Sequence, residues 1–497
     1  MTSILPEKKG PVTPSGWGTL QKASGIIANA CREKSLITIW GHDDLDGIAS
    51  TAIMTDALKG KTEVNYYIPP KNGVHYGLEV AVIDRLIAAG TGLIITVDGG
   101  ISNYTEAEYC RQKGVPLIIT DHHELPKELP PALVVLNPKV KEAGSPYPNL
   151  CGAAVALYLA AALDGADSED WLQMNSRRLC WASLATVSDR VPLLEDNRMI
   201  LKAGLKAIPE DPVLARLAGL LGFDFSRGLS PLILQNTFIP LFAASQSQGD
   251  RHPMVELLLG TMDESSVKDL WEKQKEWRRK FAQELNEKLA LFSGREAMIL
   301  TLVDPDLQSD MVGPLAGGLR DSFLLPAIVI GKKGGAYVGE ARGYLPFDLV
   351  EMLAGLKDHF TQYGGHKQAA GFTLKSGILE RFVPAVESYS SEHRDLILSS
   401  RPQKKYDHRF DGLAQLKEKV NGMLGNGPYG PGNPWPVCLI GNVKMPLDFR
   451  DSRTAWLDDL LAAQDQSGLR PEEICAELDV TSKGQVSLSL KNKNQFI

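Results

Sequence analysis

Short apolar runs alternate with amphipathic stretches over the first 140 residues of the chain. Runs of strand length are expected to form five β-strands at Leu36–Trp40, Asn65–Ile68, Leu93–Val97, Pro116–Thr120 and Leu133–Leu136. Segments with apolar residues at helical spacing are expected to form helices at Thr19–Lys34, Ile48–Leu58, Leu78–Ala89 and Tyr104–Lys113. Strands that alternate with helices predict a parallel sheet with right-handed crossovers.

The pattern changes to helix from Cys151 onward. Helical spacing predicts helices at Ala153–Leu163, Arg177–Ser188, Arg198–Ala207 and Val213–Leu221. Glu264–Phe292 holds neither Pro nor Gly, and at 1.5 Å per residue it predicts a helix of about 45 Å that bridges two domains. A second α/β domain is expected from strands at Met298–Val303, Ala327–Ile330 and Ala336–Glu340 and a helix at Phe347–His359.

The tail begins a third pattern. Gly425–Pro434 is a run of turn residues that predicts neither helix nor regular strand, and short strands are expected at Val437–Ile440 and Val486–Leu490. A chain of 497 residues is too long for one ordinary core. We therefore expect a lead-in and helix over residues 1–35, an α/β domain over 36–260, a connecting helix over 261–293, a second α/β domain over 294–400 and a C-terminal module over 401–497.

Composition limits the function classes. Hydrophobic residues make up 43% and charged residues 23% of the chain, as in ordinary globular proteins. The six cysteines are scattered without a C-x-x-C pair, which disfavours a disulfide framework or a zinc knuckle and favours a reducing cytoplasm. No apolar run has the length of a signal peptide core or of a bilayer span, so we expect a soluble, cytoplasmic protein without a membrane partner. The net charge of −7 argues weakly against nucleic acid, although bound cations reverse the local field of clustered acids.

Three predicted strands end in acids or histidines. Leu36–Trp40 leads into Gly41-His42-Asp43-Asp44-Leu45-Asp46-Gly47, Leu93–Val97 leads into Asp98, and Pro116–Thr120 leads into Asp121-His122-His123. Ligands of open parallel sheets bind outside the carboxyl ends of the strands, so these residues should converge. In an extended turn, Asp44 and Asp46 can face one point. Each strand end alone would be ordinary turn chemistry, but three at one edge favour a site.

The donor types indicate which metal would bind. Carboxylates with neutral imidazole suit Mn²⁺ or Mg²⁺, and the absence of nearby thiolates disfavours structural zinc. Two ions that share a carboxylate are expected, because such a pair activates a water and clamps a phosphoryl group.

Four motifs carry a resemblance to the DHH phosphoesterases. They are Gly41–Gly47, Val97–Ser102, Thr120–His123 and Thr186–Pro192, and both their order and their spacing fit. Gly364–Gly371 resembles the glycine-glycine-histidine signature of the DHHA1 substrate domain. Within the superfamily the chain resembles the RecJ-type single-strand exonucleases. The resemblance implies an α/β fold in which a parallel-sheet DHH domain is joined by a long helix to a smaller α/β DHHA1 domain, with an OB-like or partial OB module at the C-terminus.

The resemblance also implies residue roles. The implied metal ligands are Asp44, Asp46, Asp98, His122 and Asp189, with Asp98 as the bridge and His42 as a further candidate. His123 would contact the scissile phosphate, and Asp121 would orient a histidine. The implied substrate-binding residues of the second lobe and its surroundings are Gly364, Gly365, His366, Arg342 and Lys71.

The implied activity is that of a 5′-to-3′ exonuclease with two Mn²⁺ or Mg²⁺ ions. It would act on single-stranded nucleic acid, for which we expect DNA in preference to RNA, and release mononucleotides in DNA repair. The segment Leu241–Gln246 lacks the backbone-gripping arginines and asparagine of RecJ proteins, and Lys71 stands at an expected arginine. We therefore expect weaker phosphate binding, reinforced by a replication or repair partner protein. The alternatives are a phosphodiesterase for short oligonucleotides or cyclic dinucleotides and a non-catalytic RecJ-related replication scaffold. The long helix argues against the first alternative, and the intact set of metal ligands argues against the second.

Overall fold

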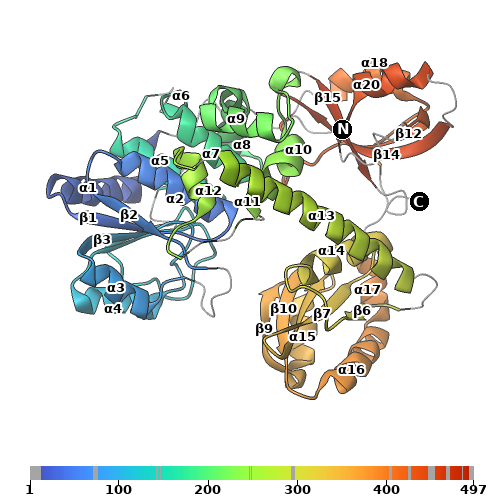
Figure 1. Cartoon of the computed structure of the whole chain (residues 1–497), viewed down its shortest axis with the longest axis horizontal. Helices are drawn as coiled ribbons and strands as arrows, with labels where there is room; N and C mark the ends of the chain where they lie inside the picture. Colours follow the sequence, from blue (N-terminus) through green and yellow to red (C-terminus); the bar gives the residue numbers. More distant parts are fainter. Residues whose placement is uncertain are drawn as a thin grey trace.

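The chain folds around three five-stranded sheets, each with its own apolar core (Figure 1). In this computed structural model the described residues are 13–70, 77–140, 144–145, 147–168, 171–243, 245, 247, 249–262, 264–292, 297–401, 406–423, 427–445, 454–465, 471–483 and 485–491. None of the helices in these ranges is both long enough and apolar enough to cross a bilayer.

The first sheet is parallel throughout, as the alternating pattern predicted. Its strands lie in the order β2 (Val64–Tyr67), β1 (Leu36–Trp40), β3 (Thr91–Thr96), β4 (Leu117–Thr120) and β5 (Val134–Leu136). The prediction of five strands is confirmed. Because β1, β3 and β4 are neighbours and run in the same direction, their carboxyl ends meet at one edge.

Helices cover both faces of this sheet. Residues Ile37, Ile39 and Ile95 belong to the core beneath α1 (Gly18–Arg32), α2 (Leu45–Leu58), α5 (Gly152–Leu163) and α7 (Ser176–Ser188). Alternate positions such as Ile94 face α3 (Val80–Ala88) and α4 (Tyr104–Lys113). This follows from the period of two in a strand, which sends successive side chains to opposite faces.

Further helices complete the first unit. They are α6 (Trp171–Met174), α8 (Glu195–Ala207), α9 (Pro212–Leu220), α10 (Pro231–Ile233), α11 (Ile239–Ala243) and α12 (Pro253–Leu259), and a π-helical segment spans Leu234–Phe238.

Near the N-terminus, Trp17 is fully buried, with its ring 5.9 Å from that of Tyr158. Trp17 and α1 therefore belong to the first core, and the expected helix is present, while residues 1–12 lie outside the described ranges.

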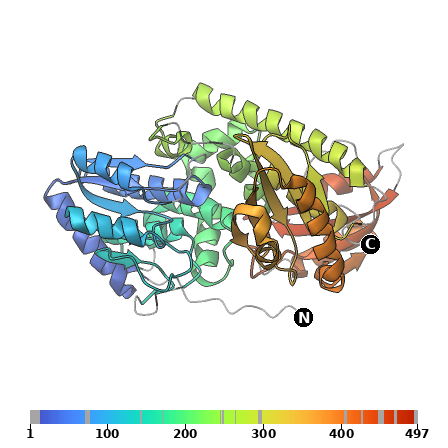
Figure 2. The same cartoon turned by 90° about the horizontal axis from the view of Figure 1, so that it is seen from below.

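The long helix α13 (Glu264–Phe292) joins two units, with the bounds that the sequence predicted. Val267 lies in the first core, whereas Trp277, Phe281 and Leu285 pack against the second. The indole Nε1 of Trp277 also donates a hydrogen bond to Asp310 Oδ2 at 2.8 Å. In both views α13 reaches from the green helices of the first unit to the orange second unit (Figure 1 and Figure 2).

The second sheet is mixed. Its order is β6 (Leu300–Val303), β7 (Ala327–Lys333), β8 (Ala336–Arg342), β10 (Ala369–Leu374) and β9 (Phe360–His366), with only β6 and β7 parallel. Its helices are α14 (Val312–Phe323), α15 (Leu349–Gly355), α16 (Leu379–Glu392) and α17 (Arg394–Ser400). The helix expected over 347–359 is shorter, because Asp348 caps it at its N-terminus and a 3-10 turn replaces it from Lys357.

The third sheet contains β11 (His408–Phe410), β12 (Val437–Lys444), β14 (Pro471–Val480), β15 (Val486–Lys491) and β13 (Thr454–Trp456), in that order. Helices α18 (Leu413–Met423) and α20 (Leu457–Ala462) accompany it. We refer to the described residues from 406 to 491 as the C-terminal module. Its OB-like character and the exact domain limits stay predictions.

Candidate metal centre

The first two carboxylates come from the start of α2. Asp44 is the N-cap residue, and its Oδ1 accepts a hydrogen bond from Gly47 N at 2.9 Å. Asp46 stands in the first helical turn, so the helix begins earlier than the expected Ile48, and the pair does not lie in an extended turn. The cap chemistry explains the difference, because a carboxylate that accepts from the exposed N–H groups of a helix stabilises its first turn.

Asp46 is held from the opposite side by a second helix. Its two carboxylate oxygens accept hydrogen bonds from Gly152 N and Ala153 N, each at 2.7 Å, at the N-terminus of α5. A helix N-terminus carries partial positive charge, which favours the ionised acid. Asp46 is therefore fixed in orientation before any ligand binds.

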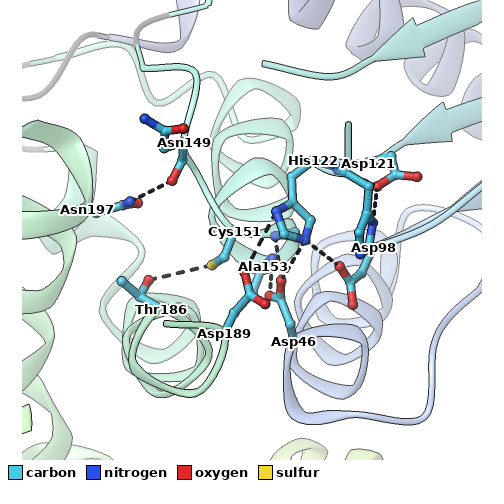
Figure 3. Close-up of polar contacts among 12 residues, drawn as sticks. Asp46, Asp98, Asp121, His122, Asn149, Cys151, Ala153, Thr186, Asp189 and Asn197 are labelled. Carbon is cyan, nitrogen blue, oxygen red and sulfur yellow. Dashed lines mark hydrogen bonds and ion pairs between the residues drawn. The ribbon is translucent and has the colours of Figure 1, made fainter. Parts of the chain in front are cut away.

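His122 lies at the centre of the cluster. Its Nε2 is 3.1 Å from Asp98 Oδ1 and 3.5 Å from Asp46 Oδ2, and its Nδ1 is 3.7 Å from Asp189 Oδ2. Figure 3 shows the three acids converging on this imidazole from β3, α2 and the end of α7. The ends of three predicted strands, β1, β3 and β4, and of one predicted helix, α7, thus meet at one point.

Asp98 reaches this position through a strained backbone and a close contact. Its φ is 55°, in the left-handed region that residues with side chains rarely adopt. A Cβ at Gly152 would lie 2.7 Å from Asp98 Oδ1, so only glycine fits there. Backbone strain of this kind persists where the surroundings enforce it, and it is concentrated at functional sites.

His42 lies beside the cluster, not in its buried centre. Its Nδ1 is 3.2 Å from Asp44 Oδ2 and 3.9 Å from Asp98 Oδ2. Burial opposes protonation of His42, but the hydrogen bond and charge of Asp44 outweigh it and raise the pKa of the imidazole. His42 can join a metal site only after giving up its proton, and its role as a ligand stays a prediction.

Asp121 orients the second histidine of the motif. Its Oδ1 accepts from His123 N at 3.0 Å and lies 2.7 Å from His123 Nδ1, and its Oδ2 accepts from Ile101 N at 2.9 Å. The hydrogen bond to Asp121 raises the pKa of His123, whose side chain is 57% exposed. A solvent-facing imidazole held in this way suits contact with a phosphate.

The electrostatics of the cluster fit divalent cations. Burial and the charges of Asp46 and Asp44 raise the pKa of Asp98 well above its ordinary value and that of Asp189 to about 8. Burial lowers the pKa of His122, which favours the neutral imidazole that metals require. Asp98 Oδ1 is buried and makes no hydrogen bond within the described part of the chain. Crowded carboxylates with an unsatisfied oxygen are the environment that a bound cation would stabilise.

The donor atoms also suggest more than one ion. Three overlapping groups have ligand atoms within 4.8 Å of one another: Asp98, His122 and His123; His42, Asp44 and Asp98; and Asp46, His122 and Asp189. Asp98 and His122 each occur in two of these groups. Oxygen and imidazole donors without thiolates suit Mn²⁺ or Mg²⁺.

The substrate-binding candidates lie elsewhere. Arg342 ends β8 and pairs with Ala369, which in turn pairs with His366, so the three positions are neighbours across the second sheet. Arg342 Nη1 donates to Glu340 Oε2 at 2.7 Å. At Gly365, whose φ is 137°, a Cβ would lie 2.6 Å from the Ala369 carbonyl oxygen. The pairing of β9 with β10 therefore requires glycine at position 365, whether or not this residue binds substrate.

Gly364 occupies the same strand, β9, with open space around its Cα. Lys71 falls outside the described residues. Neither these glycines nor Arg342 belongs to the carboxylate cluster. In the segment that lacks the backbone-gripping arginines, Leu241 and Phe242 are fully buried in the first core, whereas Ala244 and Gln246 are outside the described ranges.

The structure adds one supporting pair that the sequence did not reveal. His252 Nε2 is 3.1 Å from Asp43 Oδ1, and Asp43 Oδ2 accepts from Ser247 N at 3.2 Å. The pair connects the loop between β1 and α2 to the cap of α12. The only local signal was His252 before Pro253, which is typical of a helix start, and nothing in the sequence links it to a residue 209 positions away.

A parallel sheet that gathers aspartates and histidines at its carboxyl edge defines a DHH-type α/β protein, and the sequence model of the DHH family, N-terminal domain, matches residues 36–182. The single-stranded-DNA-specific exonuclease RecJ of Salmonella typhimurium is 30% identical, over 95% of this chain and 89% of the relative. The chain therefore belongs to the RecJ family of single-stranded-DNA-specific exonucleases.

Two further comparisons agree with this family. RecJ of Bacillus subtilis is 30% identical over 86% of this chain, but the match spans only 54% of the relative, so the chain spans about half the length of that protein. A crystal structure of exonuclease RecJ bound to manganese has a TM-score of 0.61 at 26% identity, and the match covers 79% of this chain and 96% of that one.

Proposed function

We propose that this protein is a metal-dependent phosphodiesterase that degrades single-stranded DNA from the 5′ end and releases mononucleotides. The observation that carries the proposal is the convergence of Asp46, Asp98 and Asp189 on His122, within a chain of the RecJ family. Residues 36–260 form the catalytic domain, residues 294–400 form the substrate-binding domain, and residues 261–293 join them.

The metal ligands in this proposal are Asp44, Asp46, Asp98, His122 and Asp189, with His42 as an additional ligand and Asp98 as the bridge. Two Mn²⁺ or Mg²⁺ ions, when bound, supply charge neutralisation and an activated water for attack on phosphorus. Hard oxygen donors and a neutral imidazole support these metals, and a RecJ structure with bound manganese is among the relatives.

His123 contacts the scissile phosphate, because its imidazole is exposed and its Nδ1 is held by Asp121. A fixed ring orientation lowers the entropic cost of placing that contact. Arg342, Gly364, Gly365 and His366 hold other phosphates from the second sheet, with Lys71 as a further contact.

The substrate reaches the site as a single strand of several nucleotides. Leu241 and Phe242 are buried in the first core, so their side chains do not contact a nucleic-acid backbone. We therefore expect weak binding that a replication or repair protein reinforces in DNA repair. Its dependence on salt should be flatter than with a full set of phosphate contacts, because fewer cationic contacts release fewer counterions.

The test is a rate series with Mn²⁺ on 5′-phosphorylated single strands from a dinucleotide to about thirty nucleotides, the upper length chosen to exceed single-strand site sizes. Rates that hold or increase with length, with little cleavage of blunt duplex, support the proposal. A rate that is greatest for the dinucleotide and falls steeply with length would instead make this chain an oligonucleotide phosphodiesterase.

A further inference from the structure

The loop that follows Asp189 has a strained backbone at both ends. Arg190 has a φ of 57° and Glu195 a φ of 45°, and both are non-glycine residues in the left-handed region. Such conformations persist only where neighbouring groups hold them. Asp189 itself is the C-cap of α7, at a helix end where backbone order is weakest.

The C-terminal module supplies some of the contacts that hold this loop. Leu193 N donates a hydrogen bond of 2.7 Å to Pro431 O. Arg198, one turn into α8, donates from Nη2 to Gly427 O at 2.6 Å and from Nη1 to Pro428 O at 3.2 Å. Three hydrogen bonds thus connect the stretch 193–198 to the turn at 427–431.

The glycines of that turn allow the close approach. A Cβ at Gly430 would lie 2.5 Å from Leu193 Cδ1, and one at Gly432, whose φ is 76°, would lie 3.2 Å from Pro192 Cβ. The turn is closed by hydrogen bonds of 2.7 and 3.0 Å between the backbones of Gly430 and Asn433. The turn therefore meets the Asp189 loop with its own backbone hydrogen bonds already satisfied.

Tyr429, in the same turn, is only 4% exposed and belongs to the apolar core of the C-terminal module. A ring with so little exposed surface cannot stack on a base of the substrate, so its part here is structural.

Other ligands of the cluster are fixed inside the first unit. Asp46 is held by the N-terminus of α5, and Asp98 is confined by Gly152. Within the first unit, Asn197 Nδ2 donates to Pro192 O at 3.0 Å and to Asn149 O at 2.7 Å, and Leu194 N donates to Pro192 O at 2.8 Å; the contact with Asn149 is visible in Figure 3. The remaining contacts described above come from a segment 229 to 238 residues further along the chain.

We propose that the C-terminal module braces the metal centre: the turn at 427–433, anchored by Arg198, sets the loop at 190–195 and thereby aims the Asp189 carboxylate. Arg198 is a positioning residue, and the module contributes no ligand of its own. This inference rests on the proposed function, because it takes Asp189 as a metal ligand.

The module docks at a second place, which provides a matched control. Arg227 forms two hydrogen bonds with Asp459, at 2.6 and 2.8 Å, and thus also joins the first unit to the module. Arg227→Ala therefore removes as many charged donors as Arg198→Ala but leaves the Asp189 loop untouched.

The experiment measures two properties of the full-length chain and of the variants R198A, R198K and R227A. Calorimetry of Mn²⁺ binding without substrate should show an affinity at least about tenfold weaker in R198A, because residues that support metal ligands generally contribute this much. The affinity should be partly restored in R198K. In R227A it should stay within about twofold of the wild type. Hydrogen exchange of the metal-free chain should show faster exchange at residues 190–195, above all at the Leu193 amide, in R198A but not in R227A.

Unchanged Mn²⁺ affinity in R198A, or equal losses of Mn²⁺ affinity in R198A and R227A, would contradict the proposal that the turn positions Asp189. If R198A fails to fold, R198K decides, because lysine keeps one donor and loses the fork, and its affinity should still fall below that of R227A. The exchange comparison requires no metal. A wild-type chain that binds no Mn²⁺ would refute the proposed function, while the exchange rates at 190–195 would still decide whether the turn holds the loop.

Discussion

Replacement of Asp189 by asparagine should stabilise the metal-free chain. Burial and the charges of Asp46 and Asp44 raise the pKa of Asp189 from 3.8 to about 8. A carboxyl group with a raised pKa in the folded state stabilises the fold at low pH, and this contribution is lost as the pH rises through about 8. As far as this group is concerned, the wild type without metal is therefore less stable at neutral pH than at low pH. Asp189→Asn removes this ionisable group and with it the loss of stability.

The magnitude follows from the same pKa. Each pH unit between the ordinary pKa and pH 7 is worth about 1.4 kcal/mol, or about 4 kcal/mol in total. The Asp189 side chain is 29% exposed, so solvent screening reduces the expected gain in the free energy of unfolding to about 1–3 kcal/mol. Asp269→Asn, an exposed substitution on α13, should change it by less than about 0.5 kcal/mol.

The assay is urea denaturation in the presence of a chelator at several pH values, repeated with Mn²⁺. The advantage of Asp189→Asn over the wild type should be small near pH 4 and should grow as the pH is raised to about 8. Added Mn²⁺ should stabilise the wild type and leave the variant nearly unchanged, because only the wild type binds the ions well. A variant that is less stable than the wild type at pH 7 without metal would refute the reasoning that these carboxylates repel one another.

Three further substitutions test the site. Asp98→Ala should abolish Mn²⁺-dependent hydrolysis while the melting transition is retained, and a variant that melts normally but cleaves at a near-native rate would contradict its bridging role. Gly152→Ala places a Cβ 2.7 Å from Asp98 Oδ1, so denaturation should show a loss of about 1–3 kcal/mol and calorimetry a weaker Mn²⁺ affinity; unchanged affinity would mean that Asp98 is not confined by this contact. His366→Ala should leave Mn²⁺ affinity unchanged and reduce turnover sharply, and calorimetric loss of an ion would instead assign His366 to the metal site.

Much of the first unit and the long helix could be predicted from the sequence, because their signals are local. Leu36–Trp40, Tyr104–Lys113 and Glu264–Phe292 have the bounds that periodicity indicated. The hairpin of β9 and β10 was not predicted, because Gly364, Gly365 and Ala369 have low strand propensity and their pairing depends on the neighbouring strand.

The site was partly predictable for the same reason. Parallel strands bring their carboxyl ends together, so the convergence of Asp46, Asp98 and His122 follows from the order of elements. Asp189 ends a helix, and only the family resemblance suggested it. The contacts of His252 with Asp43 and of Arg198 with Gly427 join residues 209 and 229 positions apart, and no local pattern encodes them.

The central claim is that this metal centre removes nucleotides from the 5′ end of a single strand. The most direct measurement is a time course with Mn²⁺ on one single-stranded DNA labelled at either the 5′ or the 3′ end. Our account predicts that the 5′ label appears at once as a mononucleotide, that the 3′ label appears first in progressively shortened strands, and that a chelator stops both. Early release of the 3′ label, internal fragments, or cleavage that continues in the chelator would contradict it.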